Sequence, residues 1–247
     1  TKVRLPVLTS MFGFLQNKAA VALQPGVHPI FTYVNSDIFL FEEFARAARR
    51  VAGLGDFKRY LMVGERMEYW FNSTTTSMTL AKVREATLAF GHYRGRWAVD
   101  YFTFGPETWS HIPRFVIGRP RFDNWLVANA RGVRVDATLG VVAMHTIHDY
   151  SHAGATEGIR DDFKSPIIEE KNPGRNYNEQ IIKAGRKDDV YYREGSLNHL
   201  CLKLKPSRDN GFCFYRADNT SYSCTGGDLQ VHRNWVSGAK GDILCGK

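Results

Sequence analysis

The stretch "YVNSDIFLFEEF", Tyr33 to Phe44, joins the end of an apolar strand to a small polar cluster and then to the start of a helix. Upstream, "HPIFTYV" has the composition of a buried strand. A carboxylate placed where a core strand ends is costly to bury unless a partner or a metal ion compensates it. Asp37 therefore predicts a ligand-binding site at this strand end, with N-capping of the following helix as the alternative.

Strand-like and helix-like segments alternate along the first 150 residues. Helical spacing of apolar residues covers 7–18, 42–53, 79–90 and 122–132, whereas strand patterns cover 29–40, 59–71, 97–105 and 133–145. This alternation predicts an α/β fold with a mostly parallel sheet flanked by helices. After about Gly154 the chain becomes polar and irregular. We expect one domain over 1–180 and a cysteine-rich extension over 181–247.

Composition narrows the class of protein. The 247 residues are 43% hydrophobic, which is enough for one sizeable core. No run of 18 apolar residues occurs, so no membrane span is expected in this chain. The formal net charge of +8 favours anionic partners such as phosphates, nucleotides or acidic glycans. The basic residues are spread out, and nucleic acid is not an expected partner.

The four cysteines lie in the last fifth of the chain, at Cys201, Cys213, Cys224 and Cys245. None belongs to a CxxC pair, which argues against a zinc knuckle. An even number of cysteines in a Gly-, Asn- and Ser-rich tail predicts two disulfides in an oxidising compartment, with all three pairings open and reduced thiols as the alternative.

Two sequons, at Asn72 and Asn219, are compatible with glycosylation and a secretory route. Together with the cysteines they favour the secretory pathway (Golgi lumen) or the extracellular space, and the cytoplasm stays open as the alternative.

Three polar segments are expected beyond the carboxyl ends of the strands, where open α/β sheets bind ligands. They are Asn35-Ser36-Asp37, "GRPRFDNWL" (118–126) and "VVAMHTIHDYSH" (141–152). Transfer of a sugar from a nucleotide donor needs such a set, because a divalent cation neutralises the diphosphate leaving group and a carboxylate deprotonates the acceptor hydroxyl. Asp37 and His145 suit Mn²⁺ or Mg²⁺, and Asp123 suits the base.

The same segments resemble a known family. "YVNSDI" is similar to the variant DxD metal motif of GT-A-type glycosyltransferases, and "FDNWLVANARGVRVDATLGVVAMH" resembles the family stretch that runs from an acidic residue to a histidine. "VGERMEYWF", "VDYFTF", "FVIGRPRFDNWL" and "HDYSH" resemble a glycosyltransferase-like group with that fold, over roughly residues 5–180. The resemblance implies a GT-A-like domain, with Asp123 as the catalytic base and Asp37 and His145 as metal ligands.

Further roles are expected around this centre. Candidate donor contacts are Asn35, Ser36 and Arg119; candidate acceptor contacts are Asp100, Asn124 and Trp125; His148, Asp149 and His152 can line the site or bind metal. Several site candidates have a structural alternative: helix capping for Asp123, a core position for His145 and Trp125, an ion pair with Asp123 for Arg119, and a bond to a neighbouring loop for Asp100.

These observations support more than one function. The first is a metal-dependent glycosyltransferase of the inverting kind that uses a nucleotide-sugar donor and a glycan or glycoprotein acceptor. About 34 residues precede Asn35, which leaves little space for the βαβ segment that binds the base in GT-A-type folds. We therefore expect either a piece of a longer chain or a non-catalytic secreted glycan-binding or structural protein of the same fold. A metal-dependent hydrolase built on the cluster of His148, Asp149 and His152 is a third hypothesis. The sequence predicts no oligomeric state.

Overall fold

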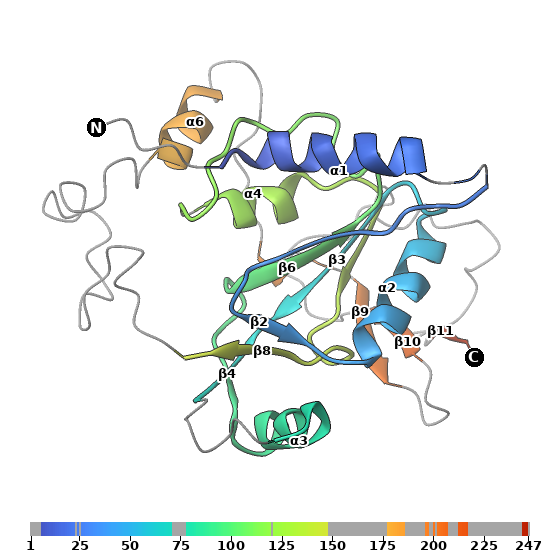
Figure 1. The fold of residues 1–247 in the computed structure, drawn as a ribbon, viewed down its shortest axis with the longest axis vertical. Coiled ribbons are helices and arrows are strands. Elements are labelled where there is room, and N and C mark those ends of the chain that lie inside the picture. The colour runs from blue at the N-terminus through green and yellow to red at the C-terminus, as the bar shows by residue number, and fades with distance from the viewer. Residues whose placement is uncertain are drawn as a thin grey trace, which may run out of the picture.

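A computed structural model describes two sheets and the helices that pack on them (Figure 1). The described residues are 6–22, 24, 26–70, 78–119, 121–147, 177–185, 196–197, 200, 202–206, 212–216 and 244–246. Within these ranges, no helix has both the length and the apolar character needed to cross a membrane.

The larger sheet has seven strands in the order β1-β6-β3-β7-β9-β10-β11. Their bounds are β1 Phe31–Val34, β3 Tyr60–Glu65, β6 Val99–Phe104, β7 Val133–Asp136, β9 Leu202–Pro206, β10 Phe212–Arg216 and β11 Leu244–Gly246. Only the β3–β7 and β7–β9 pairs of this sheet are parallel, and its other pairs are antiparallel.

The α/β class is confirmed, but the predicted mostly parallel sheet is wrong, because the sheet is mixed. In a parallel sheet, the helix predicted over 79–90 would connect two parallel strands. Instead α3 (Leu80–Phe90) packs against the smaller sheet, and the chain then enters β6 between β1 and β3, antiparallel to both (Figure 1).

The smaller sheet has the order β2-β8-β4-β5. Its strands are β2 Ile38–Leu40, β4 Met67–Tyr69, β5 His92–Tyr93 and β8 Ala143–Thr146. Three of the segments predicted as strands, 29–40, 59–71 and 133–145, are each divided between the two sheets. The first half of each lies in the larger sheet and the second half in the smaller one. The first two breaks carry polar residues, Asn35-Ser36-Asp37 and Arg66, whereas the third, 137–142, is mostly apolar.

Helices cover both faces of the larger sheet. α1 (Leu8–Ala22) and α4 (Phe122–Asn129) share one apolar cluster with the inward side chains of β1, β3 and β6. α2 (Glu43–Leu54) packs on the opposite face, over Tyr60, Met62 and Tyr101. Figure 1 shows this arrangement, with α1 and α4 above the sheet and α2 on the other side. α6 (Tyr177–Gly185) joins the α1–α4 face through Ile182.

Strands β9 and β10 come from the segment predicted as an extension, 181–247. They continue the larger sheet beyond β7, and their apolar side chains belong to the cluster beneath α2. The side chains that they bury there are Leu202, Leu204, Phe212 and Phe214. This part of the chain therefore shares one core with the first 150 residues.

Candidate functional site

The turn after β1 carries Asp37 to the first position before β2. The amide of Ile38 donates to the carbonyl of Asn35 at 3.1 Å, which closes the turn. In the β2–β8 pair Ile38 lies opposite His145, and Nε2 of His145 is 3.2 Å from Oδ2 of Asp37. His145 is fully buried. The fold thus brings together the two predicted metal ligands, which are 108 positions apart in the sequence.

The alternative role of Asp37 as a helix cap is wrong. Helix α2 begins at Glu43, its N-cap residue is Glu42, and strand β2 lies between that helix and Asp37. Helix capping therefore does not explain why a carboxylate stands at the end of this core strand.

A carboxylate oxygen beside an imidazole nitrogen fits Mn²⁺, and Mg²⁺ with less preference. Such ions commonly take one or two protein ligands and complete their shell with water and substrate phosphates. Over the described ranges, no group of three or more His, Cys, Asp or Glu side chains is arranged to hold a metal ion. His148, Asp149 and His152 lie outside the described residues. The Asp37–His145 pair thus fits a cation that shares its shell with a phosphate ligand.

A second acidic group, Asp100, lies beside the turn and is held by hydrogen bonds. Asn35 Nδ2 donates to Asp100 Oδ1 at 2.6 Å, and the hydroxyl of Tyr33 donates to Oδ1 of Asn35 at 2.8 Å. Arg66 Nη1 donates to Asp100 Oδ2 at 2.7 Å. Asn35, a predicted donor contact, and Asp100, a predicted acceptor contact, therefore bind each other in this structure.

Asp123 lies in the first turn of α4, where it accepts a hydrogen bond from the amide of Asn124 at 2.9 Å. It is not the N-cap residue, which is Arg121, although a carboxylate at this place does suit the helix dipole. Burial raises the pKa of Asp123 to about 6, with a smaller raising effect from the charge of Asp100 and a lowering effect from the Asn124 amide. A carboxyl that ionises near pH 6 suits a general base.

The side chain of Tyr33 links the turn to α4, because its hydroxyl donates to Asn35 and its ring contacts Phe122. The pKa of Tyr33 is raised to about 12, mainly by burial and then by the charges of Asp100, Asp123 and Asp37 in that order. The ring of Tyr33 meets Phe122, the neighbour of Asp123, edge-on with the ring centroids 6.0 Å apart.

The remaining predicted residues divide into three groups. Trp125 is buried in the core edge-on to Phe115, which assigns it a packing role. Arg119 is also buried, and its Nη1 donates to the carbonyl of Gly118 at 3.0 Å. Ser36 is exposed and Asn124 is half-buried. The predicted residues that lie outside the described part of the chain are Asn72, Cys201, Asn219 and Cys224.

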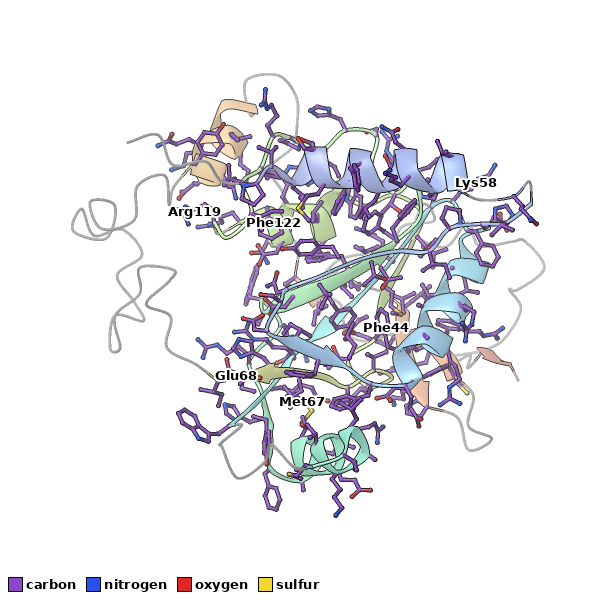
Figure 2. All side chains as sticks on the ribbon, viewed as in Figure 1. Phe44, Lys58, Met67, Glu68, Arg119 and Phe122 are labelled. Atoms are coloured by element: carbon purple, nitrogen blue, oxygen red, sulfur yellow. The ribbon has the colours of Figure 1, made fainter. Side chains whose placement is uncertain are left out.

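Sequence reasoning missed Tyr33, Arg66 and Glu68 as members of the site. Glu68 is buried on β4, opposite His145 in the β4–β8 pair, and Figure 2 shows it beside β8. The one available signal was charge: Glu65, Arg66 and Glu68 interrupt an otherwise apolar strand pattern, where an ionic side chain needs a partner.

Comparisons with known proteins found no match: no family model, no curated protein and no solved structure matches this chain.

Proposed function

We propose that this chain is a metal-dependent glycosyltransferase with a GT-A-like domain. It would move a sugar, with inversion, from a nucleotide-diphosphate donor to a glycan or glycoprotein acceptor. The observation that carries the proposal is the contact between Asp37 and His145, and a second carboxyl, Asp123, has a pKa raised to about 6. Metal ligands and a general base are the two protein components that this chemistry needs.

The mechanism gives each side chain one task. Asp37 and His145 would hold Mn²⁺ or Mg²⁺, which when bound neutralises charge on the diphosphate leaving group. Asp123 is ionised above about pH 6 and accepts the proton of the acceptor hydroxyl. The acceptor oxygen then bonds to the anomeric carbon as the bond from that carbon to the diphosphate oxygen breaks on the opposite face.

Other features fit this assignment. The net charge of +8 favours an anionic donor. In the β10–β11 pair Cys213 lies directly opposite Cys245, a register at which the Cα separation suits a disulfide. A disulfide at this place would agree with the proposed location in the secretory pathway or outside the cell.

Calorimetric titration of Mn²⁺ in the presence of a panel of nucleoside diphosphates tests the proposal. We expect one cation site in the wild type that depends on a particular nucleotide. Asp37→Ala should abolish the binding, because it removes one of the two protein ligands. Glu85→Ala is the control, since Glu85 is an exposed acidic residue on α3.

The outcomes separate the candidate functions. Loss of binding in Asp37→Ala but not in Glu85→Ala supports the transferase. A folded wild type that binds neither Mn²⁺ nor any nucleotide refutes it and leaves the non-catalytic glycan-binding or structural protein. Glycan-array binding that does not require metal would support that alternative directly.

A further inference from the structure

Arg66 is the single residue that separates β3 from β4, so it stands where the chain passes from the larger sheet to the smaller one. Its side chain is 11% exposed. Nη1 is 2.7 Å from Asp100 Oδ2, and Nη2 is 3.3 Å from Glu68 Oε1. One guanidinium therefore bridges a carboxylate of the larger sheet and a carboxylate of the smaller sheet.

Through Asp100, Arg66 is connected to the turn that carries Asp37. Asp100 binds both the main chain and the side chain of Asn35. Its carbonyl oxygen accepts a hydrogen bond from the Asn35 amide at 2.9 Å, and its Oδ1 accepts one from Asn35 Nδ2 at 2.6 Å. Asn35 in turn closes the turn that presents Asp37. A shift of the Asp100 carboxylate would consequently move the turn.

The Glu68 side of the bridge leads to His145. Glu68 and His145 are direct partners in the parallel β4–β8 pair, so their side chains leave the small sheet on the same face. Glu68 is also bound by Arg94, whose Nε is 3.3 Å from the same Oε1 atom. Arg66 differs from Arg94 because it reaches Asp100 as well.

We propose that Arg66 is a positioning residue that sets the distance and orientation between Asp37 and His145. The use of that pair for a cation rests on the proposed function, but the positioning itself does not. A buried guanidinium between two carboxylates carries a large desolvation cost, which good geometry must offset. Its planar fork can bind both acids at once, whereas the single ammonium of lysine cannot reproduce that geometry.

The first experiment follows the imidazole of His145 by long-range ¹⁵N–¹H NMR, with His145→Gln to assign its signals. We expect Arg66→Lys to move or broaden the Nε2 signal of His145, as Asp37→Asn should do directly. Arg59→Lys is the matched control: Arg59 pairs only with Glu107 among the described ion pairs, at an exposed place outside this network, and its substitution should leave that signal unchanged.

A purely structural role for Arg66 gives a different result. Arg66→Lys would then lower the melting temperature and leave the His145 signal unchanged, which would overturn the inference. If Arg66→Lys fails to fold, Asp100→Asn replaces it, because this substitution removes the charge that Arg66 binds and keeps an oxygen for Asn35. An unchanged His145 signal in a folded Asp100→Asn protein would equally overturn it.

The second experiment titrates Mn²⁺ into the same variants. Changes to groups that orient metal ligands typically cost about 10–100-fold in metal affinity, and we expect a loss in that range for Arg66→Lys. Arg59→Lys should stay within about twofold. If the wild type binds no Mn²⁺ but the His145 signal changes in Arg66→Lys, the positioning role of Arg66 is supported and the transferase proposal fails. If the wild type binds Mn²⁺ and both variants match it, the positioning inference fails instead.

Discussion

At the scale of single residues, Asp123 lies in an environment that costs stability when its carboxyl is ionised. Its pKa is 3.8 as an ordinary carboxyl and about 6 in the folded chain, mainly because burial disfavours the charge. The folded state therefore binds a proton more tightly than the unfolded state. The resulting stabilisation is complete below about pH 4 and is lost as the pH rises through about 6. At neutral pH the ionised carboxylate destabilises the fold, as is common for catalytic groups.

Asp123→Asn should therefore stabilise the protein at neutral pH and abolish transfer. One unit of pKa shift corresponds to about 1.4 kcal/mol, so we expect the free energy of unfolding to rise by about 1–3 kcal/mol at pH 8. The gain should shrink to about zero at pH 4, where Asp123 is protonated. Urea unfolding at both pH values measures it, with Glu107→Gln as the control on an exposed ion pair. Equal stability of variant and wild type at pH 8 would contradict the raised pKa.

At the scale of elements, local pattern predicted α1, α2, α3 and α4 well, but it predicted neither α6 nor the division of the strands. The spacing of apolar residues predicted helices over 42–53 and 79–90, and these ranges are close to the observed bounds of α2 and α3. The segment 59–71 was predicted as one strand, whereas the structure divides it at Arg66. Where a strand breaks depends on its partners in space, here β6 and β7 for the first half and β8 for the second. The same limit explains why Asp37 and His145 were identified but Glu68 was not: the first two belong to recognisable motifs, and Glu68 gains its place only through pairing.

Glu43 shows how one side chain joins several elements. It opens α2 and is buried, and its Oε1 accepts from the amide of Val142 at 3.2 Å and from Nε of Arg84 at 3.1 Å. Glu43→Ala leaves the amide and the guanidinium without these bonds, so we expect a loss of about 2–4 kcal/mol in the free energy of unfolding. Denaturant titration measures the loss. Glu42→Ala, at an exposed N-cap with no side-chain hydrogen bond, should change stability by less than about 0.5 kcal/mol. Similar losses in both variants would show that Glu43 does not join these elements.

At the scale of the whole molecule, two apolar clusters lie on opposite faces of one sheet, and the candidate site lies where that sheet meets the smaller one. Trp125 belongs to the apolar cluster on the α1–α4 face, and Phe214 of β10 belongs to the cluster on the α2 face. The charge of Arg50 on α2 lies over the ring of Phe214, 5.7 Å from its centroid. Because β7 and β9 pair directly, we expect both faces to unfold together.

Phe214→Ala tests whether β9 and β10 belong to the cooperative unit that carries the site. The ring is almost fully buried, so its removal should cost about 3–5 kcal/mol. The unfolding midpoints measured by far-ultraviolet circular dichroism and by tryptophan fluorescence should both move to the same lower denaturant concentration. The fluorescence comes in part from Trp125 on the opposite face of the sheet, so a shared midpoint means that both faces unfold together. Phe14→Ala removes an exposed ring from α1 and should change the midpoint little. If the fluorescence transition stayed at its wild-type midpoint while circular dichroism showed an earlier partial loss, residues 202–216 would fold as a separate module. The site would then depend only on the first 150 residues.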